Sequence, residues 1–273
     1  MRKRLLPSGW YPSTASEVQE TLDEWKQDSK SHPQTACAAI APHAGWYFSG
    51  KLAWQSWLSA FNADCVVVAG GHLGAGNPIL LYDDTEYAVP GGALPVCRDL
   101  VDAIRMHCTV RPDHSADNTV EIQLPFCAFR FGYSIPVVGI RVPEDEQAIA
   151  LGKLLADWST MYAVQLFVLG STDLTHYGPN YGFMPAGTGK QAEIWAANND
   201  KQFIDACLAL DAQAILHAGR DLQAACSSGG AACAASYAKA LKASHAELLA
   251  YETSLAKHYD SSFVGYASIA FSS

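Results

Sequence analysis

The sequence has 273 residues and lacks a long hydrophobic run, a Cys-x-x-Cys pair and an excess of positive charge. No apolar stretch reaches the roughly 20 residues of a membrane-spanning helix, which argues against a membrane protein. Its eight cysteines fit neither a zinc ribbon nor a disulfide scaffold, and a cytoplasmic location is expected. Asp and Glu outnumber Lys and Arg by 27 to 18, which argues against nucleic acid as a partner, because nucleic-acid-binding proteins carry a basic surface.

The composition is typical of a chain with a sizeable core, because 49% of the residues are hydrophobic and only 16% are charged. Glycine and proline are spread along the chain rather than gathered in a linker, so a single domain over residues 1–273 is expected. Apolar runs alternate with segments of helical periodicity, which predicts an α/β fold. In this fold, a mainly parallel or mixed central sheet is covered by helices in three layers. Strands are expected at 37–41, 65–69, 79–82, 135–140, 164–170, 247–252 and 263–271, and helices at 13–30, 49–60, 94–107, 120–131, 144–158, 190–210, 211–217 and 230–241.

Two of the expected strands are followed by a histidine. His43 comes after the first strand within Pro42-His43-Ala44-Gly45, and His72 comes after the second within Gly70-Gly71-His72. Sites in open α/β sheets lie beyond the carboxyl ends of the strands, so the two imidazoles are expected to converge on one metal ion. The alternatives are a histidine that caps backbone at the strand end and a loop histidine bonded to backbone. A phosphate-binding loop is disfavoured, because no convincing helix follows and no Gly-x-x-x-x-Gly-Lys-Ser/Thr motif occurs.

Asp173-x-x-His176 places a carboxylate and an imidazole at the end of another strand. The pair could act as general acid and base, or as a ligand and its supporting partner. The alternative is a local turn in which Asp173 caps backbone amides.

Cys226 stands just before an expected helix, whose dipole favours the thiolate, a soft metal ligand and a nucleophile. The alternative is an inert buried thiol. The remaining histidines have no partner pattern and are expected on the surface or in packing, and the acidic segment 113–117 around His114 is either a lid or a solvated loop. Those remaining histidines are His32, His107, His217, His245 and His258.

Taken together, the motifs resemble those of the Memo family, also called AmmeMemoRadiSam system protein B. The resemblance runs nearly from end to end, and the combination of Ala-Pro-His-Ala-Gly with Asp-x-x-His-Tyr-Gly is fairly specific. The matching elements are Gly9-Trp10-Tyr11-Pro12, Ala41-Pro42-His43-Ala44-Gly45, Gly71-His72, Val120-Glu121-Ile122-Gln123-Leu124-Pro125-Phe126, Ser171-Thr172-Asp173-Leu174-Thr175-His176-Tyr177-Gly178 and the segment around Cys226.

The resemblance implies a fold similar to that of the class III extradiol dioxygenases, which use non-haem Fe(II). It implies His43, His72 and Cys226 as metal ligands, with Asp173 and His176 as the catalytic residues that line the pocket. The dioxygenases have a carboxylate where this chain has the thiolate, and a thiolate favours iron or copper over metals that prefer hard oxygen ligands. Fe(II) is therefore the expected cofactor, with copper or zinc as alternatives. Residues expected in the substrate pocket lie in or beside the matched motifs and are Trp46, Glu121 and Tyr177.

The sequence departs from the family pattern at two positions. Asn118 stands where family members commonly have histidine, and Ser227 stands where they have glycine after the cysteine. Asn118 cannot titrate near neutral pH, so proton transfer by that histidine would be absent. The metal triad survives both changes, whereas the substrate pocket is expected to differ.

Three functions are compatible with these residues. The first is a metal-dependent redox protein, such as a non-haem iron dioxygenase-like enzyme. The second is a non-catalytic module that binds a peptide or partner and keeps only the pocket. The third is a zinc-dependent hydrolase that activates water. The expected ligand is a small molecule or peptide, and the resemblance implies AMMECR-type and radical SAM proteins as partners.

Overall fold

The structure is a computed structural model that describes residues 1–27 and 33–273. Its helices are α1 (Ala15–Gln27), α2 (Lys51–Ser59), α3 (Arg98–His107), α4 (Asn118–Glu121), α5 (Leu124–Phe131), α6 (Glu146–Tyr162), α7 (Lys190–Leu208), α8 (Ala212–Leu222) and α9 (Ser228–Ala240). Its strands are β1 (Ala38–Ala41), β2 (Cys65–Gly70), β3 (Ile79–Leu81), β4 (Glu86–Val89), β5 (Gly92–Pro95), β6 (Val110–Pro112), β7 (Val137–Arg141), β8 (Leu166–Ser171), β9 (His176–Tyr177), β10 (His245–Thr253) and β11 (Phe263–Ser272).

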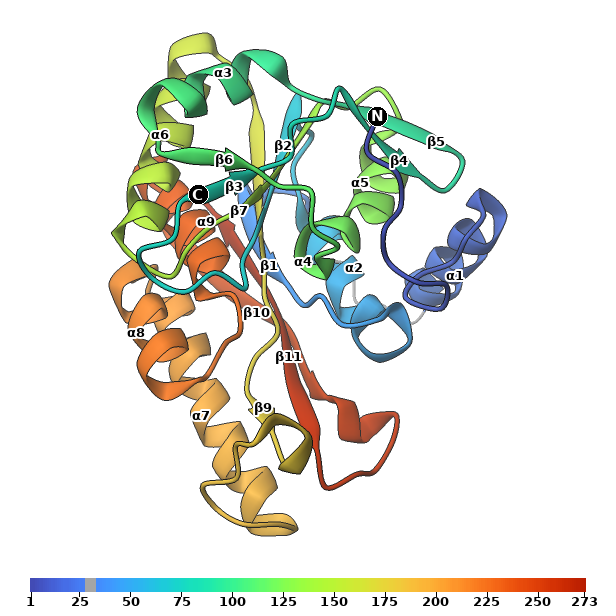
Figure 1. The fold of residues 1–273 in the computed structure, drawn as a ribbon, viewed down its shortest axis with the longest axis vertical. Helices are drawn as coiled ribbons and strands as arrows, with labels where there is room; N and C mark the ends of the chain where they lie inside the picture. The colour runs from blue at the N-terminus through green and yellow to red at the C-terminus, as the bar shows by residue number, and fades with distance from the viewer. Residues whose placement is uncertain (28–32) are drawn as a thin grey trace.

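A mixed sheet runs through the middle of the molecule in the order β10-β11-β1-β8-β2-β7-β3-β6, and β9 pairs with β11 (Figure 1). The four central strands β1, β8, β2 and β7 are parallel, while β11 and β3 run antiparallel to their central neighbours. Every residue of the four central strands is buried. Their sequences are apolar except for Arg141 at the end of β7 and Ser171 at the end of β8, which fits this position, because helices cover both faces of the sheet.

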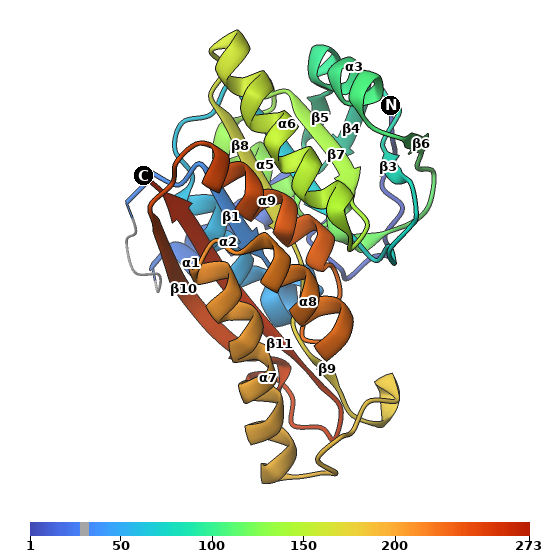
Figure 2. The same ribbon diagram turned by 90° about the vertical axis from the view of Figure 1, so that its left-hand side faces the viewer.

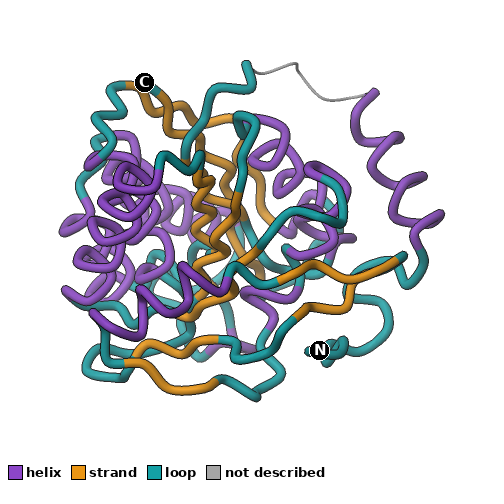
Figure 3. The backbone as a smooth tube through the Cα atoms, turned by 90° about the horizontal axis from the view of Figure 1, so that it is seen from above, coloured by secondary structure: helices purple, strands orange, loops and turns teal. Residues whose placement is uncertain are grey.

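The helices form two outer layers. Helices α6, α7, α8 and α9 lie on one face of the sheet, as Figure 2 shows from that side, and α1, α2 and α5 lie on the other. Seen from above, the strands form a central layer between the helices (Figure 3). The structure therefore confirms the predicted α/β fold with a mixed central sheet. In the described part of the chain, no helix has the length and apolar content needed to span a membrane.

Two predicted helices differ from the structure. The helix expected at 94–107 begins at Arg98, because Leu94 belongs to the β4–β5 hairpin, where it pairs with Tyr87. The helix expected at 120–131 is divided into α4 and α5, and Pro125 lies in the first turn of α5. Proline lacks an amide hydrogen and favours the start of a helix, which explains the division. The last residues of the first predicted helix, 28–30, and His32 lie outside the described residues.

Candidate metal centre

Three of the predicted site residues follow parallel strands at one edge of the sheet. His43, His72 and Asp173 each come two residues after the end of their strand, β1, β2 and β8 respectively. Cys226 comes two residues before α9, which packs on these same strands. The amino end of α9 therefore delivers the cysteine to the edge where the carboxyl ends of the strands meet.

His43, His72 and Cys226 form a compact group of potential ligands. One nitrogen from each histidine and the cysteine sulfur all lie within 4.8 Å of one another. The Nε2 atom of His43 is 3.2 Å from the sulfur of Cys226, and the two imidazole rings meet edge to face with centroids 5.0 Å apart. Two imidazoles and a thiolate suit iron, copper or zinc, so the group could bind a metal ion.

Asp117 orients the ring of His72. Its Oδ2 atom lies 3.1 Å from Nδ1 of His72, which leaves Nε2 of that ring for a ligand. The Asp117 carboxylate is itself held by the guanidinium of Arg141, 3.4 Å away, and accepts hydrogen bonds from Thr119. A carboxylate behind a histidine fixes the tautomer and direction of a metal ligand.

His43 is buried, with 1% of its surface exposed, and its ring is positioned by neighbours from β8 and the turn after it. The Ser171 hydroxyl lies 3.4 Å from Nδ1, so Nε2 is the nitrogen that faces Cys226. The carboxylate of Asp173 accepts hydrogen bonds from the backbone amides of His43 and Ala44, at 2.6 and 3.3 Å. These contacts show that Asp173 caps the loop after β1 as well as facing the site.

Ser227, which departs from the family pattern, links the loop of His72 to the turn after β8. Its hydroxyl accepts a hydrogen bond from the backbone amide of His72 (3.2 Å), and its own amide donates to the hydroxyl of Thr172 (3.1 Å). Gly71 makes this contact possible, because a Cβ at that position would lie 2.5 Å from the Ser227 Cβ. The serine at this position therefore fits against a glycine and tightens the loop that carries His72.

Contacts within the group shift the pKa values of Cys226 and His72 toward their charged forms. Burial opposes ionisation of the Cys226 thiol, but the neighbouring His43 and hydrogen bonds from both histidines hold the pKa of Cys226 well below its usual range. Burial also disfavours a charged His72, yet hydrogen bonds to Asp117 and Cys226 raise the pKa of His72 to about 10. The sulfur is therefore poised as a thiolate, the form in which cysteine binds metals.

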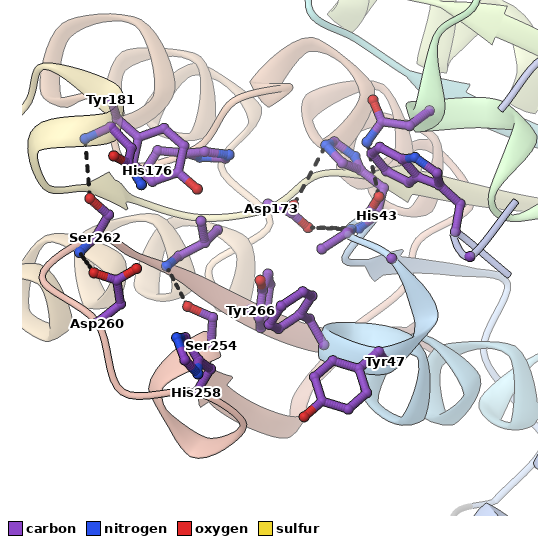
Figure 4. A pocket seen from close by; sticks show the side chains of 18 of the residues that line it. His43, Tyr47, Asp173, His176, Tyr181, Ser254, His258, Asp260, Ser262 and Tyr266 are labelled. Carbon is purple, nitrogen blue, oxygen red and sulfur yellow. Dashed lines mark hydrogen bonds and ion pairs between the residues drawn. The ribbon is translucent and has the colours of Figure 1, made fainter. Parts of the chain in front are cut away.

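A cavity of about 670 Å³ opens onto the two histidines of this group. His43, His72, Asp173 and His176 lie at its inner wall, and Figure 4 shows His43 and Asp173 together there. The predicted catalytic pair therefore does line the cavity. Among the described residues of its wall, none is lysine or arginine, so the wall offers no permanent positive charge to an anionic ligand.

The outer wall of the cavity contains residues that the sequence reasoning missed. His258 and Asp260 reach it from the loop between β10 and β11. Tyr47 and Tyr181 reach it from the short helical segments Trp46–Gly50 and Pro179–Tyr181. Tyr47 is 66% exposed and Tyr181 47%. The adjacent motif Gly9-Trp10-Tyr11-Pro12 was a usable signal, because Trp10 lines the same cavity.

Three residues predicted in the substrate pocket are placed elsewhere. Trp46, Glu121 and Tyr177 are buried and lie outside the described lining of this cavity. The carboxylate of Glu121 accepts hydrogen bonds from the backbone amides of Leu5 and Leu6 and from the hydroxyl of Tyr11. Glu121 thus anchors the N-terminal segment, next to Trp10.

Two further predictions concern the segment 113–117 and Asn118. Both acidic ends of the segment are buried, and Asp113 contacts Arg141 at 3.2 Å. Its two ends are therefore fixed in the structure, while His114, Ser115 and Ala116 between them are exposed. Asn118 lines the cavity, and its side-chain amide donates a hydrogen bond to the carbonyl of His43 (3.0 Å). Asn118 therefore fixes the loop that carries His43.

The fold and this group define an α/β protein with a possible His-His-Cys metal site at the edge of a mixed sheet. The sequence model of the family described as "Memo-like protein" matches residues 2–270. A MEMO1 family protein of Pyrococcus horikoshii is 27% identical over 98% of this chain and 99% of its own length. One of Methanosarcina acetivorans is 29% identical over 98% of both chains. The chain belongs to the Memo-like protein family.

A solved structure extends the likeness in fold. The crystal structure of an uncharacterized protein from Escherichia coli K12 matches 85% of this chain and 98% of its own, with a TM-score of 0.52 and 10% identity. At that identity the match shows a shared fold alone.

Proposed function

We propose that this chain is a metal-dependent redox protein in which His43, His72 and Cys226 hold Fe(II), with copper as the alternative metal. The observation that supports the proposal is the ligand group itself, with its three donor atoms within 4.8 Å. The thiolate is the informative ligand, because sulfur donors favour iron and copper over magnesium or calcium. Iron held there would supply redox chemistry and a coordination position for a ligand.

The chain's own residues would bind and orient a substrate in the cavity beside this group. The side chain of His176 lines the cavity. Its Nδ1 atom is 3.0 Å from the carbonyl of Leu174, which leaves Nε2 for a ligand. Burial raises the pKa of Asp173, so this carboxyl group can carry a proton at a higher pH than an exposed one. His176 and Asp173 are therefore the residues to orient substrate and move protons.

The metal content of a Cys226→Ser variant tests the proposal. After anaerobic purification, mass spectrometry should find near-stoichiometric iron or copper in the wild type and a large loss in Cys226→Ser. Cys108→Ser is the matched control, because Cys108 is a partly buried cysteine that caps the end of α3. Equal metal in all three proteins would contradict a thiolate ligand, and metal-free protein that takes up neither Fe(II) nor Cu(I) would contradict the site.

A second candidate function is peptide or partner binding without turnover. It is favoured by the exposed rings of Tyr47 and Tyr181 at the cavity, since exposed aromatic side chains are common at recognition sites. This alternative predicts binding that survives removal of the metal. Oxygen uptake that requires both bound metal and a small aromatic substrate would contradict it.

A further inference from the structure

A second cavity reaches Cys226 from another side. It has a volume of about 380 Å³, and its wall includes Cys226, Glu144, Arg220 and Gln223. Cys226 lines this second cavity but is absent from the lining of the main cavity, whereas His43 and His72 line only the main one. The ligand group therefore lies in the wall between two cavities and faces each with different residues.

His176 and Tyr181 form the partition, because they line both cavities. Their rings meet edge to face, with centroids 4.9 Å apart and an interplanar angle of 89°. Tyr181 belongs to a short 3-10 turn, Pro179–Tyr181, and the amide of Asn180 in that turn donates to the hydroxyl of Ser262 at 3.1 Å. The labelled view in Figure 4 shows this turn beside the main cavity.

The backbone before the turn is also held closely. Gly178 has a φ of +114°, and a Cβ there would lie 2.5 Å from the carbonyl oxygen of Ser261. Only glycine fits such an approach in this conformation. The turn that carries Tyr181 is thereby pinned against the loop before β11, which fixes the Tyr181 ring at the border of the two cavities.

The two cavities differ in chemistry. Aromatic and polar residues line both cavities, but no lysine or arginine is among the described residues that line the main one. The second cavity has a carboxylate, a guanidinium and an amide at Glu144, Arg220 and Gln223. The smaller volume of the second cavity and its charged groups Glu144 and Arg220 suit a small polar molecule, whereas the larger volume of the main cavity suits a larger ligand.

We propose that the second cavity is a separate entrance through which a small polar co-reactant reaches the sulfur side of the ligand group while a larger ligand occupies the main cavity. The proposal deepens the proposed function and rests on it for the identity of the reaction, but access to Cys226 can be measured without metal.

The test is the rate at which iodoacetamide alkylates Cys226 in chelator-treated protein. In this reaction a carbon–sulfur bond forms and iodide leaves, and peptide mass spectrometry follows each cysteine separately. Gln223→Trp narrows the second cavity at an exposed wall residue, and His258→Trp does the same in the main cavity. Because thiol reactions depend on access, Gln223→Trp should slow Cys226 about tenfold and His258→Trp less than about twofold.

Two controls make the result decisive. Gln223→Ala removes bulk at the same position and should not slow the reaction. Cys108 in the same digests should react at one rate in every variant, which shows that the fold is intact. Equal slowing by both tryptophan variants, or slowing by His258→Trp alone, would overturn the separate entrance. Failure of the proposed function would appear instead as wild-type protein that binds no metal.

Discussion

The Nδ1 atom of His72 lies 3.1 Å from the Oδ2 atom of Asp117, and this contact decides which nitrogen of the ring is left for a ligand. Asp117 is buried and sits between the imidazole and the guanidinium of Arg141. Its carboxylate also accepts the backbone amide of Thr119 at the start of α4. One side chain therefore joins the loop after β2, the end of β7 and the start of α4 behind the candidate ligand.

Replacing Asp117 with asparagine should weaken metal binding. Loss of a carboxylate partner behind a ligating histidine typically costs about 10- to 100-fold in metal affinity, and we expect that range for Asp117→Asn. The measurement is a competition titration of Fe(II) or Cu(I) against a chelator. Asp113→Asn is the matched control, since Asp113 is a buried partner of Arg141 in the same network, with no contact to His72 among its described bonds. An equal effect of both variants would assign Asp117 to stability rather than to positioning.

Gly230 allows α9 to lie against the end of β2. A Cβ at this position would be 2.2 Å from the carbonyl oxygen of Ala69 and 2.9 Å from that of Gly70, and backbone cannot yield cheaply. Gly230→Ala should therefore lower the free energy of unfolding by about 1–3 kcal/mol, the usual cost of overpacking. Gly74→Ala is the control, because its nearest neighbour would be Asn77 at 3.8 Å. Urea denaturation that finds both variants equally stable would contradict the close packing of α9.

Asp200 should make stability depend on pH. It is buried on α7, where it accepts hydrogen bonds from the amide of Thr175 (2.9 Å) and the hydroxyl of Tyr251 (2.8 Å). Burial is the main cause that raises the pKa of Asp200 from 3.8 to about 6. The carboxyl group of Asp200 therefore binds its proton more tightly in the folded state than in the unfolded state. The stability that this proton gives the folded state is fully present below pH 4 and is lost as the pH rises through about 6.

The expected loss is about 3 kcal/mol, because each pKa unit corresponds to about 1.4 kcal/mol. Between pH 4 and pH 7, the unfolding free energy of the wild type should fall by that amount relative to that of Asp200→Asn. The wild type is therefore less stable at pH 7 than at pH 4 when each is compared with the variant. Denaturant titrations across this range measure it. Asp205→Asn, an exposed position on the same helix, is the control. A pH-independent difference for Asp200→Asn would show that the buried carboxyl does not titrate in this window.

The ends of β1 and β2 were predictable because these two strands contain no polar or charged residue and are buried throughout. The runs that end before His43 and His72 could be read directly, and the open edge of a parallel sheet then brings both histidines together. The sequence pattern alone placed Cys226 only before a helix, and the family resemblance was needed to assign it to the site. Its distance from the histidines depends on how α9 packs, which no local pattern contains.

The residues missed by the sequence reasoning are those brought in by long-range contacts. Asp117 lies 45 positions from His72 in the sequence, and only the folded loops show that the two meet. His258 reaches the cavity from the loop between β10 and β11, and polar residues of such a loop look the same whether they face solvent or a site. Glu121, in contrast, was expected in the substrate pocket and lies within a family motif. In the structure its buried carboxylate accepts hydrogen bonds from the backbone amides of Leu5 and Leu6 in the N-terminal segment.

The most direct test of the central claim is the metal content of a His43→Ala, His72→Ala double variant beside the wild type. Both proteins would be loaded with Fe(II) without oxygen, desalted and analysed by mass spectrometry, with circular dichroism to confirm that the variant is folded. The two imidazoles belong to the only group of this kind found among the described residues, so stoichiometric iron in the wild type should fall to background in the folded variant. Unchanged iron in the double variant would contradict a metal centre at this edge of the sheet.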